Sequence, residues 1–179
     1  MNGMKLITPT MEYDEAIQAY RNEFLECGDS MDGTSRLRRF DSTPDWLGYL
    51  KEAADDEVAV TQYVFVREED GKIVGMLDIR RIPNEFIEKY AGYVGYSVCP
   101  SERRKGYASK MLGMALKIMK GFGMESVLIT CYEENEASRK TILNNGGVYE
   151  STVYWQERNT YIERYRIDLT KSPICTADA

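Results

Sequence analysis

The chain contains no histidine, only four cysteines and no long apolar segment. Without histidine, Ser-His-Asp and Cys-His nucleophiles are excluded, so acid–base work would fall to Asp, Glu, Lys, Tyr, Cys or water. No C-x-x-C pair occurs, which indicates neither a zinc site nor a disulfide framework, and we expect no bound metal. The cysteines are Cys27, Cys99, Cys131 and Cys175. No apolar run approaches the roughly 20 residues that span a bilayer.

Positive charge is also in short supply. The 29 Asp and Glu residues outnumber the 23 Lys and Arg residues, which gives a net charge of −6. We therefore expect neither nucleic acid nor an anionic membrane as a partner. The first residues lack the pattern of a secretory signal, so we expect a cytoplasmic protein. At 179 residues the chain fits one domain, which we place over residues 1–170, followed by a tail over 171–179.

The first half of the chain alternates between helical and strand-like patterns. Apolar residues at Ile17, Tyr20 and Phe24 have helical spacing, and Gly28 is placed to end that helix. The Asp70-Gly71 pair predicts a hairpin between two β-rich runs. The expected elements are a strand in 5–10, a helix in 11–28, a loop over 29–46, a helix in 45–56 and two strands in 58–82.

In the second half, a loop over 83–91 leads to a third strand, over 92–99, that Pro100 ends. A helix then follows, and after it the apolar run 126–132 is typical of a strand buried on both faces. Strand, helix and strand span about forty residues here, which is enough for a right-handed parallel connection. A second helix over 135–147 and two aromatic strands, 147–157 and 160–169, complete the chain. We predict an α/β fold with a mixed, mostly antiparallel sheet, one central parallel pair and helices on both faces.

The stretch "CPSERRKGYASKML", residues 99–112, concentrates positive charge around a glycine between a strand and a helix. Such a turn exposes several unpaired backbone N–H groups, and the helix dipole adds partial positive charge. Gly106 allows close approach of a ligand, and Arg103, Arg104 and Lys105 surround it. These residues predict a site for a phosphate or diphosphate. Taken alone, they also fit a solvated charge run before an ordinary helix.

The spacing within this stretch is more specific than its charge. Pro100, Arg103, Gly106 and Ala108 stand in an order that resembles the acetyl-coenzyme A motif of the GNAT superfamily of N-acetyltransferases: Gln or Arg, two residues, Gly, one residue, Gly or Ala. The likeness covers about residues 75–147 and points to a group of predicted acetyltransferases, so it brings no substrate with it. It implies that the central parallel strands splay apart to receive the pantetheine arm of the coenzyme.

The resemblance implies a set of coenzyme contacts. Backbone amides of the motif would hold the diphosphate, the strand ending at Val98 would bind the pantetheine arm, and Asn135 and Ser138 would contact the coenzyme further along. Asn135 also suits a helix N-cap, a role that is compatible with ligand contact. The complete set is Val98, Arg103, Arg104, Lys105, Gly106, Tyr107, Ala108, Ser109, Asn135 and Ser138.

The acid and the base are not fixed by the sequence. Many members of the superfamily carry a tyrosine seven residues after the asparagine, where this chain has Ile142. Protonation of the coenzyme thiolate would then fall to Tyr132, Tyr96, Tyr107 or water, each of these tyrosines having core packing as an alternative role. Tyr93 stands where a side chain could face the acceptor. We take Tyr93 and Tyr132 as candidate catalytic residues.

For the acceptor pocket we select Asp78, Arg80 and Tyr96. Asp78 and Arg80 are two apart and share one face of their strand, although an ion pair on a sheet edge is an equal alternative. The function that follows is direct transfer of an acetyl group from acetyl-CoA to a primary amine in a ternary complex, with an N–H near Val98 facing the oxyanion. An acyl-enzyme on Cys131 is the less favoured route.

A second hypothesis belongs to another class, a coenzyme A-binding module without catalysis that acts as a sensor or assembly partner. Ile142 motivates it. The expected partner is a small-molecule or peptide amine, and the C-terminal aromatic strands could form an acceptor wall or the contact of a homodimer. The sequence does not decide between these.

Overall fold

The computed structural model describes residues 3–171, and the chain divides into two compact units. The first comprises residues 1–82 and 95–111, and the second comprises 83–94 and 112–179. The prediction of one domain over residues 1–170 stays a prediction, and the predicted tail lies outside the described residues, apart from Lys171. None of the described helices is both long enough and apolar enough to cross a bilayer.

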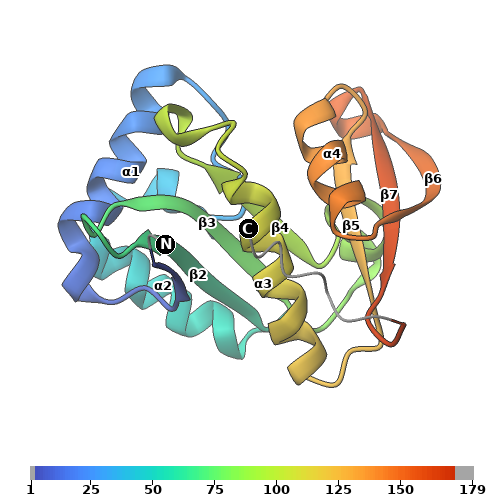
Figure 1. Ribbon diagram of the computed structural model, residues 1–179, viewed down its shortest axis with the longest axis horizontal. Coiled ribbons are helices and arrows are strands. Elements are labelled where there is room, and N and C mark those ends of the chain that lie inside the picture. The colour runs from blue at the N-terminus through green and yellow to red at the C-terminus, as the bar shows by residue number, and fades with distance from the viewer. Residues whose placement is uncertain (1–2, 172–179) are drawn as a thin grey trace. The chain divides into compact units, whose positions relative to one another are not determined.

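The first unit is built on a four-stranded sheet with the strand order β1-β2-β3-β4. The pairs β1–β2 and β2–β3 are antiparallel, and the β2–β3 register sets Val64 opposite Met76 and Gln62 opposite Asp78. Figure 1 shows this sheet with its two helices. The elements are β1 (Met4–Ile7), α1 (Asp14–Cys27), α2 (Thr43–Asp55), β2 (Val60–Arg67), β3 (Ile73–Arg80) and β4 (Val94–Val98), with short 3-10 turns at Met11–Tyr13, Leu37–Arg39 and Pro100–Glu102.

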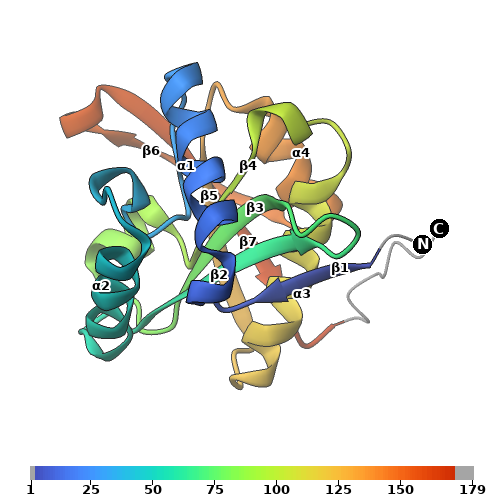
Figure 2. The same cartoon turned by 90° about the vertical axis from the view of Figure 1, so that its left-hand side faces the viewer.

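Helices α1 and α2 cover one face of this sheet, as Figure 2 shows for α1. Their buried side chains form a core with the strand residues of that face, and Trp46 at its centre donates its indole N–H to the carbonyl of Thr34, at 3.1 Å. The core comprises Ile17, Tyr20, Phe24, Leu37, Trp46, Val64, Val66, Ile73, Met76 and Cys99. On the opposite face, Phe65 contacts Tyr107 edge to face. Both faces of the sheet are therefore covered.

Local signals set the helix boundaries, and Gly28 is the one that the sequence predicted. Gly28 ends α1 in the left-handed conformation, with φ of 65°. Ser42 caps α2 by accepting a hydrogen bond from the Asp45 N–H, and Pro44 lies in the first turn. The hairpin at Asp70-Gly71 also forms, since Gly71 has φ of 70° and the Lys72 N–H donates to Asp70 Oδ1 at 3.2 Å. Local capping and turn chemistry thus fix these elements.

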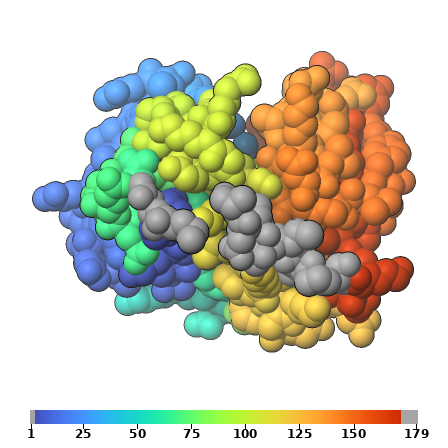
Figure 3. All heavy atoms as spheres, viewed as in Figure 1, coloured from blue at the N-terminus to red at the C-terminus, as the bar shows by residue number. Residues whose placement is uncertain are grey.

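The second unit contains a three-stranded antiparallel sheet with the order β5-β7-β6. Helix α4 lies on the surface of this unit, in orange in Figure 3. The register of β6 shifts between Tyr149 and Ser151, so Glu150 forms a bulge. The elements are β5 (Ser126–Tyr132), α4 (Glu136–Asn144), β6 (Val148–Trp155) and β7 (Thr160–Asp168), with a one-turn π-helix at Ile87–Ala91 and a 3-10 turn at Gln156–Arg158.

Helix α3 (Tyr107–Gly121) begins in the first unit and continues into the second. Its fully buried residues are Met111, Leu112, Ala115, Leu116 and Met119, which have helical spacing. Met114 and Ile118 are partly exposed.

The predicted mixed α/β fold, with mostly antiparallel strands and helices, is confirmed. The loop expected over 83–91 is wrong in part, because Ile87–Ala91 form a helical turn. The residues just before β4 do approach β5 within the second unit, since the Tyr93 N–H donates to the Leu128 carbonyl at 2.8 Å. The course of β4 beside β5 beyond that point stays a prediction.

Candidate functional site

The loop between β4 and α3 changes its backbone conformation at almost every residue. Pro100–Glu102 form a 3-10 turn and Arg103 is extended. Arg104 and Gly106 then adopt positive φ angles of 63° and 78°, a conformation that glycine tolerates and arginine rarely adopts. A strained arginine in a loop is a sign of functional constraint.

This backbone leaves a row of N–H groups without protein acceptors. The Lys110 N–H donates to the Gly106 carbonyl, directly before α3, at 3.1 Å. Within residues 3–171, no acceptor meets the N–H groups of five consecutive residues: Arg104, Lys105, Gly106, Tyr107 and Ala108. A Cβ added at Gly106 would meet no atom within 4 Å. Successive free N–H groups at a helix N-terminus suit a phosphate or diphosphate.

The three cations of the loop play different parts. Arg103 pairs with Asp29 at 2.7 Å and donates its Nε–H to the Val98 carbonyl at 3.2 Å. Lys105 pairs with Glu102 at 2.8 Å. Arg104 is exposed and has no ion pair among the described residues. Of the three cations that the sequence places around Gly106, Arg103 and Lys105 are therefore bound to carboxylates. Their role toward a ligand stays a prediction.

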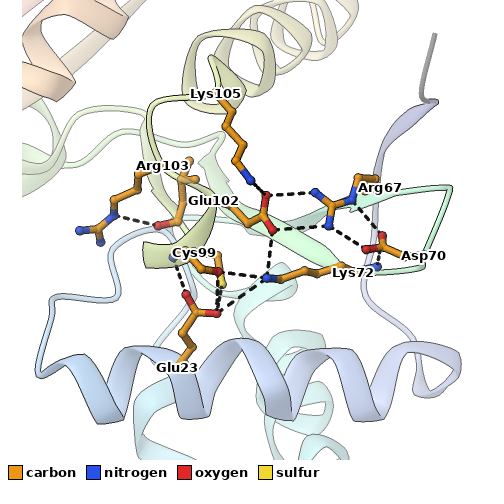
Figure 4. A network of polar contacts seen from close by, with 10 residues as sticks. Glu23, Arg67, Asp70, Lys72, Cys99, Glu102, Arg103 and Lys105 are labelled. Carbon is orange, nitrogen blue, oxygen red and sulfur yellow. Dashed lines mark hydrogen bonds and ion pairs between the residues drawn. The ribbon is translucent and has the colours of Figure 1, made fainter.

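Glu102 is the centre of a network of polar contacts (Figure 4). Glu102 is only 5% exposed. Its carboxylate accepts hydrogen bonds from Lys105 at 2.8 Å, Arg67 at 3.0 Å and Lys72 at 3.0 Å. The hydrogen bond from Lys105, together with Lys72 and Arg67, lowers the pKa of Glu102 to about 2 against the opposing effect of burial. The carboxylate is therefore ionised at every physiological pH.

Glu23 of α1 holds the other side of the same turn. One carboxylate oxygen accepts the Ser101 N–H at 2.6 Å, and the second accepts the Cys99 thiol at 2.9 Å. Burial opposes the charge on Glu23, but the bonds from Cys99 and Ser101 keep its pKa below the ordinary value. Burial and the neighbouring carboxylate raise the pKa of Cys99 to about 12. The start of the loop is thus bound to both α1 and the β2–β3 hairpin.

Sequence reasoning missed this network. Its members come from α1, the β2–β3 hairpin and the loop, and nothing in their spacing brings them together. The available signal was Glu102, a carboxylate directly before the cations Arg103, Arg104 and Lys105. A second available signal was a pair of cations, Arg67 and Lys72, on either side of the predicted hairpin turn.

A second loop of the first unit, residues 29–36, contacts β4. The Ser97 hydroxyl donates to the Asp32 carbonyl at 2.5 Å, and the Tyr20 hydroxyl bonds to Ser97. A Cβ at Gly33 would lie 2.3 Å from the backbone of Gly95. The loop and β4 can therefore approach this closely only because glycine occupies position 33. This contact gives the loop one fixed course across β4.

Asp78 and Arg80 form the predicted ion pair, at 2.9 Å, on one face of β3. The alternative of an edge position is wrong, because β3 lies between β2 and β4 and Asp78 is 5% exposed. Asp78 also accepts the Gly95 N–H at 3.3 Å, which links the pair to β4. The assignment of Asp78, Arg80 and the partly buried Tyr96 to an acceptor pocket stays a prediction.

The two candidate catalytic tyrosines belong to the second unit. Tyr93 is 7% exposed, and its hydroxyl donates to Glu88. Burial and the Glu88 carboxylate raise the pKa of Tyr93 to about 12, so this phenol stays protonated at neutral pH. Tyr132 ends β5, is partly buried and has a contact within the protein. Their catalytic roles stay predictions.

Asn135, Ser138 and Ile142 also lie in the second unit, on or before α4. The N-cap role of Asn135 is confirmed, because its Oδ1 accepts the Ser138 N–H at 3.0 Å. Ile142 is fully buried and contacts Gly147, where a Cβ would lie 2.4 Å from Ile142 Cγ2. No phenol is therefore available from this position of α4.

Cys131 has the environment of a structural thiol. It is 7% exposed, and burial together with the nearby Glu163 raises its pKa to about 12. The nucleophilic form of cysteine is the thiolate, which such a site disfavours. Cys131 is therefore disfavoured as a nucleophile.

Comparison with known proteins agrees with this geometry. The model of the acetyltransferase (GNAT) family matches residues 17–146 of the chain. A search of the curated proteins found no match.

Solved structures share the fold at low sequence identity. Ribosomal-protein-S5-alanine acetyltransferase from Vibrio fischeri has a TM-score of 0.72 and 18% identity, with 97% of each chain covered. Spermidine N-acetyltransferase from Vibrio cholerae, in complex with CoA and spermine, has a TM-score of 0.65 and 14% identity, with 94% of this chain and 96% of that chain covered. A dodecameric structure of spermidine N-acetyltransferase from the same organism scores 0.65 at 13% identity, with 94% and 95% covered.

Proposed function

Because the chain belongs to the acetyltransferase (GNAT) family and is an acetyl-CoA-dependent N-acetyltransferase, we propose that it transfers the acetyl group directly to a primary amine. The observation that carries this proposal is the row of five N–H groups from Arg104 to Ala108 that meet no acceptor within the described residues 3–171. A diphosphate would complete their hydrogen bonds, and the dipole of α3 would favour its charge. Tight anchoring of the coenzyme there would orient the thioester for attack.

We assign the coenzyme contacts as follows. The backbone of the loop would hold the diphosphate, and Arg104, as the exposed cation, would face it. Val98 would receive the pantetheine arm, and an N–H near it would stabilise the oxyanion. Asn135 caps α4 with its Oδ1, and no partner of its amide nitrogen occurs in the part of the chain that the structure describes. The assigned residues are Val98, Arg103, Arg104, Lys105, Gly106, Tyr107, Ala108, Ser109, Asn135 and Ser138.

Transfer would proceed in a ternary complex. The amine nitrogen attacks the thioester carbon, the carbon–sulfur bond breaks, and the sulfur leaves as a thiolate that takes up a proton. With Ile142 buried on α4, we assign this proton to Tyr132 or water. The nitrogen loses its proton to water or through Tyr93, whose own hydroxyl is bound to Glu88. Orientation would then supply most of the rate acceleration.

The acceptor is an amine, and two classes suggest themselves. The similar structures include a spermidine N-acetyltransferase in complex with CoA and spermine and a ribosomal-protein-S5-alanine acetyltransferase. We propose a pocket that includes Asp78, Arg80 and Tyr96. A polyamine and a peptide N-terminus are the first acceptors to test.

The test is turnover of acetyl-CoA, followed by release of the free thiol, against a panel of spermidine, spermine, N-terminal alanine peptides and free amino acids. We expect CoA binding by calorimetry and thiol release with at least one amine. Absence of CoA binding would contradict the proposal.

The second candidate function is a coenzyme A-binding module without catalysis. Ile142 favours it, because this fully buried residue leaves α4 without a phenol. Tight CoA binding with no thiol release on any amine of the panel would support this candidate over the enzyme. We further propose a single folded domain over residues 1–170, a cytoplasmic location and assembly as a homodimer.

A further inference from the structure

The β4–α3 loop is held by Glu102, and we propose that Glu102 is a positioning residue for coenzyme binding. This inference rests on the proposed function, since it concerns the same row of N–H groups. Glu102 contacts no part of a bound coenzyme in this proposal. It acts by fixing the loop that does.

The first argument is the cost of burying this side chain. A carboxylate that is 5% exposed is retained only when several partners compensate its lost hydration. Glu102 has three cationic partners, each at 3.0 Å or less: Arg67, Lys72 and Lys105. A hydrophobic residue could fill the same space without this expense. The charge therefore serves a purpose that simple packing would not require.

The second argument is where the partners come from. Arg67 and Lys72 stand on either side of the β2–β3 hairpin, and Lys72 also donates to the Ser101 hydroxyl at 3.0 Å. Glu102 lies two residues before Arg104, the first free N–H of the row. Figure 4 shows the carboxylate between the hairpin cations and Lys105. The ion pairs thus tie the loop to a rigid part of the sheet.

The third argument is the charge balance. Lys105 is half exposed, and its ammonium group forms an ion pair with Glu102 at 2.8 Å. This ion pair holds the ammonium group at the Glu102 carboxylate. Loss of Glu102 would leave three cations without their shared carboxylate. Two effects then compete: more positive charge near the diphosphate, and a loop without its anchor. We expect the second to dominate, because the directions of five consecutive N–H groups depend on the position of the backbone.

Asp70 provides a matched control. It pairs with the same Arg67, at 2.7 Å, and among the described residues it makes no hydrogen bond or ion pair with the loop. Asp70→Asn and Glu102→Gln remove the same unit of charge from one cluster. An effect of charge alone would appear in both variants, whereas an effect of loop position would appear only in Glu102→Gln.

The experiment is calorimetric titration of CoA into wild-type protein, Glu102→Gln, Glu102→Asp and Asp70→Asn, each confirmed as folded by circular dichroism. We expect the Kd to rise at least tenfold in Glu102→Gln, to rise less in Glu102→Asp, and to stay within twofold in Asp70→Asn. Should Glu102→Gln not fold, Lys72→Met removes the contacts to Glu102 and Ser101 from the hairpin side and is expected to raise the Kd at least threefold.

An unchanged or lower Kd in Glu102→Gln, or an equal rise in Asp70→Asn, would overturn the inference while leaving the proposed function in place. If Glu102→Gln does not fold, a Kd for CoA that rises less than threefold in Lys72→Met would also overturn the inference and leave the proposed function in place. Wild-type protein that binds no CoA would overturn both.

Discussion

Gly106 is the residue at which the backbone of the candidate site can be altered with least damage to the fold. Its φ of 78° disfavours any residue with a Cβ, but no atom lies within 4 Å of the position that a Cβ would take. We expect Gly106→Val to fold and to bind CoA at least tenfold more weakly, because a left-handed conformation costs an L-residue about 1–2 kcal/mol and the N–H row would shift to avoid it. Calorimetry with CoA checks this, and unchanged affinity would contradict the placement of the diphosphate.

Arg103 offers a graded comparison at the same site. Its guanidinium already pairs with Asp29 and donates to the Val98 carbonyl. Its attraction to a bound diphosphate would therefore be reduced. We expect Arg103→Ala to weaken CoA binding by about 1 kcal/mol, less than Gly106→Val. The same titration measures both variants, and a larger loss in Arg103→Ala would show that the side chain matters more than the backbone.

Cys131 tests whether an acyl-enzyme forms. Burial and Glu163 raise its pKa to about 12, so the thiol is neutral at pH 7 and a poor nucleophile. We expect Cys131→Ala to retain thiol release from acetyl-CoA within about threefold, since a small apolar side chain suits a buried position. Mass spectrometry of wild-type protein mixed with acetyl-CoA should show no added acetyl group at Cys131. Acetylation there, abolished in the variant together with turnover, would establish the covalent route.

At the scale of elements, the regions with strong local signals were predictable. Gly28, Ser42 and the Asp70-Gly71 pair fix ends and turns through their own backbone chemistry. The N–H row at the start of α3 was predictable for the same reason, because it follows from one glycine between a strand and a helix. The turn at Ile87–Ala91 was not, because five residues carry too short a pattern for a helix to be distinguished from a loop.

The partners of the charged residues were not predictable. Glu102 meets Arg67 and Lys72 across 35 and 30 positions of sequence, and only the folded hairpin brings them together. The same holds for Arg103 and Asp29. Which cation of the loop is exposed therefore depends on tertiary contacts that the sequence does not display.

The network of polar contacts centred on Glu102 also predicts how the stability of the protein changes with pH. Its pKa of about 2 lies below the ordinary value of 4.5, so its ion pairs stabilise the folded protein fully above pH 4.5 and lose effect as the pH falls toward 2. We expect Glu102→Gln to lower the free energy of unfolding by about 1–3 kcal/mol at pH 7. That difference from wild type should shrink between pH 4.5 and pH 2.

Urea unfolding at pH 7, 4 and 3 measures this difference, with Glu52→Gln as a control at an exposed position of α2. The control should show no pH-dependent difference from wild type. A gap between wild type and Glu102→Gln that stays constant from pH 7 to pH 3 would mean that the carboxylate is not ionised in the folded protein.

For the whole molecule, the open question is whether the two compact units fold as one domain. Helix α3 runs through residues 111 and 112, where one unit ends and the other begins, and both of these residues are fully buried. A continuous helix with buried residues on either side of that boundary favours a single cooperative transition, as expected for a domain of this size. The two tryptophans provide the probes, because Trp46 lies in the first unit and Trp155 in the second.

We expect Trp155→Phe to unfold in urea with one midpoint for two signals: the fluorescence of Trp46, which reports the first unit, and far-ultraviolet circular dichroism, which reports both. Phenylalanine keeps an aromatic ring beside Tyr90, where Trp155 stacks at 5.1 Å, so the substitution should cost little stability. A single domain over residues 1–170 requires the two curves to coincide, because no state with one unit folded is then populated. Circular dichroism that continues to change after the Trp46 signal is complete would instead mean that the second unit, with β5, β6 and β7, is stable on its own.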